Sequence, residues 1–198
     1  YSLLVMSVVL TGRAPYEKII TYQYVRDEHG NEFHKSGGNS LECDIVADKV
    51  GAETIRYLYA GANPTNDMRF GFSLTDEARR KIMAFWNIYS FFNTYAVLDN
   101  PDIASHKINF EEMNITDKWL LLKTNEFIEN SNKNYSEYKY FAVVKDFELF
   151  VDDISNFYIR SNRKRFWKSS STDQMDAYYS LYYAIKACVG VMAPIMPF

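Results

Sequence analysis

The chain carries a short polar loop whose residue types suit phosphate binding. The loop follows a run at 19–26 that alternates and is rich in β-forming residues, and it contains Lys35, Ser36, Gly38 and Asn39. A lysine on a glycine-containing loop can reach the charge that builds up on a leaving phosphate group, while a serine hydroxyl and glycine amides add hydrogen bonds. The alternative is a solvated hairpin tip, because polar residues with glycine are also typical of such turns.

A second group of residues is cationic and lies in the segment 156–168, where five of thirteen residues are basic. Arg160, Arg163 and Lys164 are spaced so that a helix would place them on one face. Such a face can clamp RNA phosphates, with an aromatic side chain beside it as a stacking surface. The alternative is a solvated face near a helix C-terminus, where cations also favour the helix dipole. The candidate RNA-binding residues are Asn156, Arg160, Arg163, Lys164, Arg165 and Trp167.

Other kinds of site are not indicated by the residue pattern. His29, His34 and His106 are scattered, without the spacing of a metal site or a catalytic triad. Cys43 and Cys188 lie far apart, which is typical of free thiols in a reducing compartment. Neighbouring acids on a helix point about 100° apart and do not converge for proton transfer. We therefore expect no bound metal and no acid–base pair.

The composition predicts a packed globular protein of cytoplasmic type. Hydrophobic residues make up 47% and aromatic residues 17% of the 198 residues. The net charge is −3, so any contact with RNA must come from a local patch. No apolar run reaches the ~20 residues that a membrane span needs, and residues 3–10 lack the flanks of a signal peptide. The chain begins at Tyr1 without an initiator methionine and ends at Phe198 just after an apolar helix-like run, so we expect a piece of a longer protein.

The patterning predicts a mainly α-helical fold with a small α/β part at the start. Residues 1–10 are apolar on nearly every side, as a buried helix or strand would be. A strand is expected at 19–26, a hairpin turn at 27–31, and short helices at 42–49 and 52–59. Longer helices are expected at 73–97, with its N-cap near Thr75, at 116–134, capped by Thr116, and at 140–166 and 173–192. Four such helices with short connections favour an antiparallel four-helix bundle.

The polar loop and the helix after it resemble two consecutive segments of the class I aminoacyl-tRNA synthetases. That family carries a Lys-Met-Ser-Lys-Ser loop, often continued by Leu-Gly-Asn, with which Lys35, Ser36, Gly38 and Asn39 agree. Residues 51–58, Gly-Ala-Glu-Thr-Ile-Arg-Tyr-Leu, are similar to the family's Gly-Ala-Asp-Ala-Leu-Arg-x-Tyr-Leu helix. The resemblance implies that Lys35 and Ser36 are catalytic and that all four loop residues bind ATP.

The basic segment resembles isoleucyl-tRNA synthetases in particular. Residues 150–156, Phe-Val-Asp-Asp-Ile-Ser-Asn, are similar to their Phe-Val-Asp-Asp-Leu-Ser-Asn run, and the segment 156–167 to their Asn-Trp-Tyr-Val-Arg…Arg-x-Arg-Phe-Trp helix. The resemblance implies a ligase that uses ATP with Mg²⁺ to join isoleucine to tRNA. It implies the end of a catalytic domain with the lysine loop at 1–70 and a helical anticodon-binding domain at 71–198. The expected partner is the anticodon arm of a tRNA; no membrane partner is expected, and the protein is expected to be a monomer.

Three departures from the family pattern keep other interpretations open. Glu32, Phe33 and His34 replace the first lysine, the methionine and the first serine of the family's loop. One alternative is a catalytically decayed synthetase paralogue that acts as an RNA-binding or regulatory module. Another is an interaction bundle without any role in RNA binding. The family's His-x-Gly-His nucleotide motif is absent, so the chain by itself is predicted to be inactive.

Overall fold

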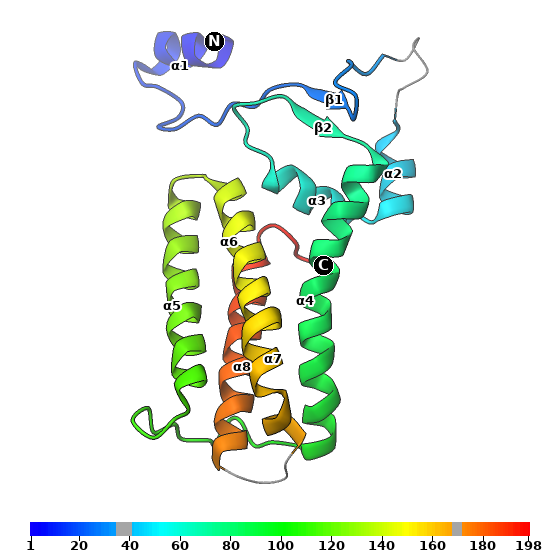
Figure 1. Cartoon of the computed structure of the whole chain (residues 1–198). Helices are drawn as coiled ribbons and strands as arrows, with labels where there is room; N and C mark the ends of the chain where they lie inside the picture. Colours follow the sequence, from blue (N-terminus) through cyan, green and yellow to red (C-terminus); the bar gives the residue numbers. More distant parts are fainter. Residues whose placement is uncertain (35–40, 168–171) are drawn as a thin grey trace.

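The computed structural model describes residues 1–34, 41–167 and 172–198, and the described part is mostly helical (Figure 1). Its first part contains α1 (Ser2–Thr11), β1 (Val25–Asp27), α2 (Cys43–Val50), α3 (Ala52–Gly61) and β2 (Met68–Phe70). Its second part contains α4 (Phe72–Asp99), α5 (Ile115–Ser136), α6 (Tyr140–Asp152), α7 (Arg160–Asn162) and α8 (Thr172–Met192). A π-helical segment (Asp153–Ile159) joins α6 to α7, and a 3-10 turn (Arg163–Trp167) follows α7.

The α/β part is smaller than the sequence predicts. The strand expected at 19–26 is reduced to β1, which pairs in parallel with β2 in the register Val25↔Met68. β2 is not predicted from the sequence, because a three-residue strand has too few positions to show alternation. The expected turn after β1 is present, with Gly30 at φ 91° and an antiparallel bridge between Arg26 and Glu32.

The first ten residues form a helix but are not buried. No residue of α1 is buried, and Figure 1 shows the helix standing apart from the rest of the chain. The expectation of a buried element is therefore wrong for the described chain, although the apolar character of the helix is as the sequence indicates.

Four long helical segments lie side by side in the second part (Figure 1). Three of these segments are α4, α5 and α8. The fourth is a rod formed by α6, the π segment, α7 and the 3-10 turn. The side chains of Leu120, Val143, Ile154 and Leu181, from three of these segments, are fully buried where the segments meet. The core therefore lies between the helices, as their apolar faces predict.

The N-caps of two helices differ from the predicted ones. α4 begins at Phe72, so Thr75 lies inside its first turn and donates a hydrogen bond from Oγ1 to the Phe72 carbonyl. α5 is capped by Asn114, whose side chain accepts from the Thr116 backbone amide. In both cases an earlier residue takes the cap position, and the threonine that was expected to cap the helix lies within it.

Candidate nucleic-acid interface

The lysine loop lies outside the described residues. This applies to Lys35, Ser36, Gly38 and Asn39, so their predicted roles remain predictions. The flank of the loop is described, and there the Glu32 carboxylate lies 3.3 Å from the Arg26 guanidinium and 3.6 Å from His34 Nε2. The charge of Glu32 is thus partly neutralised by Arg26 of β1.

Three cations are exposed at the far end of the rod. Arg160 directly follows the π segment and opens α7, while Arg163 and Lys164 open the 3-10 turn. All three side chains are exposed, and within the described chain none of them forms an ion pair. Asn156 is also exposed, one turn earlier in the π segment. These cations are therefore available to a polyanion.

Trp167 lies beside these cations in a fixed orientation. Its side chain is exposed, and its indole Nε1 donates a hydrogen bond of 2.7 Å to the Tyr95 hydroxyl on α4. The Arg163 guanidinium lies 5.9 Å from the centre of the indole ring. An exposed ring that cannot rotate freely is a suitable surface on which an unpaired base can stack. We name Arg160, Arg163, Lys164 and Trp167 together the basic end.

Arg165 does not belong to this exposed set. Its guanidinium lies 2.6 Å from Asp117 Oδ2 and also donates to Asp117 Oδ1 and Asp173 Oδ2. Burial lowers the pKa of Arg165, but hydrogen bonds to Asp117 and Asp173 outweigh it, so the net direction is upward. The Asp117 side chain is fully buried, so this ion pair joins the rod to the start of α5. We therefore withdraw Arg165 from the residues expected to contact RNA.

A buried hydrogen-bond network surrounds this ion pair and supports the basic end. The Tyr158 hydroxyl donates to Asp117 Oδ1 over 2.6 Å, and Asn162 Nδ2 donates to the Tyr158 carbonyl. Asn162 Oδ1 accepts from Thr116 and from Arg165. Burial, followed by the nearby Asp117 carboxylate, raises the pKa of Tyr158 well above its usual value. In the sequence Asp117 only follows Thr116 at the start of a predicted helix, and nothing local marks its burial.

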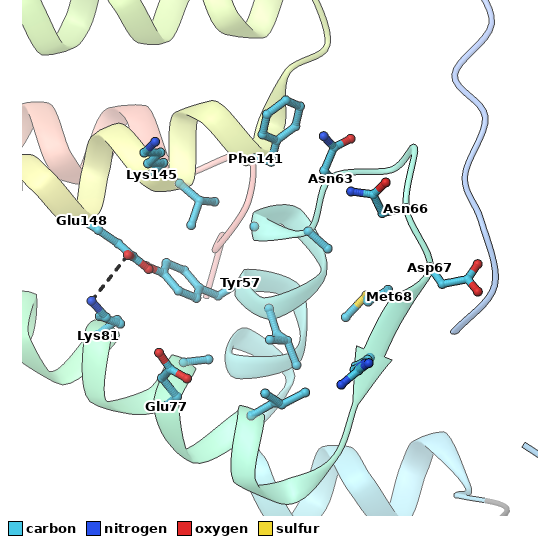
Figure 2. A pocket seen from close by; sticks show the side chains of 17 residues that line it. Tyr57, Asn63, Asn66, Asp67, Met68, Glu77, Lys81, Phe141, Lys145 and Glu148 are labelled. Carbon is cyan, nitrogen blue, oxygen red and sulfur yellow. Dashed lines mark hydrogen bonds and ion pairs between the residues drawn. The ribbon is translucent and has the colours of Figure 1, made fainter. Parts of the chain in front are cut away.

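A cavity of about 610 Å³ lies at the other end of the helices, between α3, β2, α4 and α6 (Figure 2). On its wall the Tyr57 hydroxyl donates to Glu148 Oε1 over 2.8 Å, and Lys81 Nζ lies 3.5 Å from Glu148 Oε2. Three cations and three acids line the cavity: Arg69, Lys81, Lys145, Asp67, Glu77 and Glu148. Because these charges balance, the cavity has no net positive charge to attract a phosphate. It marks the joint where α3 meets the helical part.

Two kinds of feature are absent from the described residues. No helix in the described ranges is long and apolar enough to cross a membrane. No group of three or more histidine, cysteine or acidic side chains in these ranges could hold a metal ion.

The chain matches two protein families in succession. Residues 1–71 match the family described as tRNA synthetases class I (I, L, M and V). Residues 117–198 match the anticodon-binding domain of tRNA ligases. The second match includes the ion pair between Asp117 and Arg165 and the whole basic end.

Relatives with curated names cover the whole chain. The isoleucine–tRNA ligase of Dehalococcoides mccartyi strain CBDB1 is 36% identical over 201 residues, and that of Clostridium novyi is 37% identical. The chain spans only about a fifth of the length of these relatives, 20% and 19% respectively.

A solved structure shows a similar fold. The methionyl-tRNA synthetase of Mycobacterium tuberculosis bound by methionyl-adenylate has a TM-score of 0.71 over 87% of this chain and 35% of that chain, at 15% identity. The two successive family matches agree with the named relatives that cover all of its residues, and the chain therefore belongs to the class I aminoacyl-tRNA synthetases and, within them, to the isoleucyl-tRNA synthetases.

Proposed function

We propose that the chain is part of an isoleucine–tRNA ligase, in which its helices form an antiparallel four-helix bundle that binds the anticodon arm of the tRNA. The observation that carries the proposal is the basic end, where three exposed cations and a fixed, exposed indole ring occupy one short segment of the anticodon-binding match. In this division residues 1–70 end the catalytic domain and residues 71–198 form the bundle.

The physical basis is local, because the chain as a whole is acidic. A net charge of −3 gives no overall attraction for RNA, so phosphates are held only where unpaired cations gather. Arg160, Arg163 and Lys164 supply that charge at the basic end, and Asn156 adds an amide one turn away. The loop of an anticodon arm offers unpaired bases, which bind by stacking on aromatic rings such as that of Trp167.

The remaining roles belong to the longer enzyme. Lys35 and Ser36 would stabilise the phosphates of ATP, supplied with Mg²⁺, during the activation of isoleucine, and Gly38 and Asn39 would complete the loop. We place the enzyme in the cytoplasm as a monomer. The chain by itself is proposed to bind the tRNA arm without catalysing the reaction.

A second candidate function is an RNA-binding or regulatory module derived from a synthetase that has lost activation. The observation that favours it is Glu32, whose carboxylate lies between Arg26 and His34 where the family has a lysine. Measurement of ATP–pyrophosphate exchange by the longer protein distinguishes the two functions. Exchange supports the ligase, and its absence together with RNA binding supports the module.

The binding proposal is tested with the 198-residue chain and a stem-loop RNA that represents the anticodon arm. Replacing Arg160, Arg163 and Lys164 together by glutamine is expected to weaken binding and to reduce the salt dependence of log Kd by about 2, since each single-strand phosphate contact contributes about 0.7. Fluorescence anisotropy at several salt concentrations measures both effects.

The matched control replaces Arg79, Arg80 and Lys145, three exposed cations at the opposite end of α4 and α6, by glutamine. This control has the same loss of charge but is expected to bind almost as the unmodified chain does. Equal weakening by the two triple variants would contradict the placement of the RNA at the basic end. An absence of binding even at low salt would contradict any role in RNA binding.

A further inference from the structure

The last residue of α4 is a carboxylate held in one orientation. Asp99 Oδ2 accepts two hydrogen bonds, one from Gln174 Nε2 at 2.8 Å and one from the Tyr178 hydroxyl at 2.6 Å. Both donors are buried residues of α8. The Asp99 side chain is exposed, and within the described residues no group donates to its other oxygen, Oδ1. The carboxylate is thus fixed on one side and has an acceptor available on the other.

Asp99 lies next to the stacking surface of the basic end. Tyr95, which accepts the hydrogen bond from Trp167, is one turn earlier on α4 and on the same face of that helix. The Tyr178 ring that donates to Asp99 packs edge-on against Phe166, at 5.2 Å between ring centres. Asp99 and Trp167 are therefore both held against the last two turns of α4.

We propose that Asp99 is a specificity-determining residue, which accepts a hydrogen bond from the exocyclic amino group of an unpaired adenine or cytosine stacked on Trp167. The proposal rests on the proposed binding of an RNA loop at the basic end. A carboxylate only accepts hydrogen bonds, so when a stacked base turns its 6-position (purine) or 4-position (pyrimidine) toward Asp99, the carboxylate pairs with the amino group of adenine or cytosine. In that orientation guanine and uracil present a carbonyl oxygen, which shares no hydrogen with the carboxylate, and their N–H groups lie further along the ring edge.

The negative charge of Asp99 distinguishes a role in base recognition from a role in phosphate binding. A negative group beside cations that hold phosphates weakens the attraction for every RNA by about the same factor. It increases discrimination only if one class of base compensates for this loss with a hydrogen bond to the charged acceptor. Phosphate contacts from Arg160 or Lys164 cannot supply such discrimination, because the backbone is the same at every base.

The test uses the 198-residue chain and a panel of stem-loop RNAs that differ only in the base at one unpaired loop position, with each loop position varied in turn. At one position the unmodified chain is expected to bind adenine or cytosine about tenfold more tightly than guanine or uracil. Asp99→Asn is expected to reverse or abolish this preference. Its amide oxygen would still accept from Gln174 and Tyr178, which turns the NH₂ donor toward the base.

Asp102→Asn is the matched control, because Asp102 is an exposed acid three residues away that bonds to Ser105 within its own loop. This variant also loses one negative charge, so it is expected to tighten binding of all RNAs equally and to keep the base preference. If Asp99→Asn changes the binding of all RNAs by one common factor, as the control does, the inference is wrong while the proposed function stands. If no RNA binds in a salt-dependent manner, the proposed function itself fails.

A second measurement does not depend on any variant folding. RNAs in which the preferred base is replaced by an analogue without its amino group are titrated against the unmodified chain. The expected result is a loss of about tenfold at that position. Equal affinity for the base and its analogue would overturn the inference.

Discussion

At the scale of single residues, identical charges in one short run have opposite roles. Arg160 and Arg165 both belong to the segment that the sequence identifies as basic. The first is exposed without an ion pair in the described chain, while the second is paired with the fully buried Asp117. The first is available to a ligand, whereas the second stabilises the element that carries the ligand-binding residues.

This difference predicts opposite effects of the same substitution. Arg165→Gln is expected to lower the free energy of unfolding by about 3 kcal/mol or more, because it leaves the Asp117 carboxylate buried without its cation. Arg160→Gln serves as the control and is expected to change stability by less than about 0.5 kcal/mol, while it weakens RNA binding. Urea unfolding followed by circular dichroism measures both variants. Equal stability of the two would show that the ion pair does not hold the rod to α5.

At the scale of elements, the rod that ends in the basic end is not a regular α-helix. The sequence predicts one helix over 140–166 on the basis of a 3.6-residue rhythm, in which Phe157 lies on the buried side. In the structure residues Asp153–Ile159 form the π segment. Ile154 and Tyr158 are fully buried, as that rhythm predicts, whereas Phe157 is exposed and packs edge-on against Trp119. The wider turn of a π segment accommodates one extra residue and changes the direction of every later side chain.

A deletion tests whether this extra residue orients the basic end. Removal of Asn156, an exposed residue of the π segment, is expected to allow a regular helix and to rotate all later residues by about 100°. Tyr158 and Arg165 would then no longer face Asp117, with an expected loss of about 3 kcal/mol or more in the free energy of unfolding. Asn156→Ala keeps the chain length and is expected to be nearly neutral. Unfolding curves that coincide for the two variants would contradict this role of the π segment.

At the scale of the whole molecule, tyrosine–carboxylate hydrogen bonds join different helices. The pairs are Tyr57 with Glu148 between α3 and α6, Tyr158 with Asp117 between the rod and α5, and Tyr178 with Asp99 between α8 and α4. Burial, followed by the carboxylate partner, raises the pKa of Tyr57 and of Tyr178. Tyr57 belongs to the segment that matches the class I tRNA synthetases, so its bond to Glu148 joins that segment to α6.

These raised pKa values predict a loss of stability at alkaline pH. In the unfolded chain a tyrosine ionises near pH 10, whereas in the folded chain these hydroxyls keep their protons to higher pH. The stabilisation is therefore fully present below about pH 10 and is lost as the pH rises above it.

Urea unfolding at about pH 9 and about pH 11 measures how steeply the free energy of unfolding falls with pH, which we call the pH slope. Tyr57→Phe is expected to show a smaller decrease than the unmodified chain, since one of the tyrosines with a raised pKa is removed. Tyr22→Phe, at a residue that is 85% exposed, is expected to leave the pH slope unchanged. A pH slope that is the same in all three proteins would contradict the assignment.

The positions of the long helices and the segments that carry family patterns can be predicted from the residues alone. The helix expected at 173–192 is α8 (Thr172–Met192), and that expected at 116–134 is α5 (Ile115–Ser136). Such helices can be predicted from the sequence because the spacing of apolar residues, the capping residues and the helix-ending residues are all local signals. The family patterns are readable for the same reason, since each is a continuous run of residues.

Only the tertiary structure decided which of these residues are available at the candidate site. The pairing of β1 with β2, the burial of Arg165 against Asp117, and the contact between Trp167 and Tyr95 all join segments more than forty residues apart. A single sequence carries no local signal for such partners, because charge and side-chain type are the same whether a residue faces solvent or a buried carboxylate. The packing of the rod against α4, α5 and α8 makes that choice, and with it leaves three cations and one indole ring exposed at the basic end.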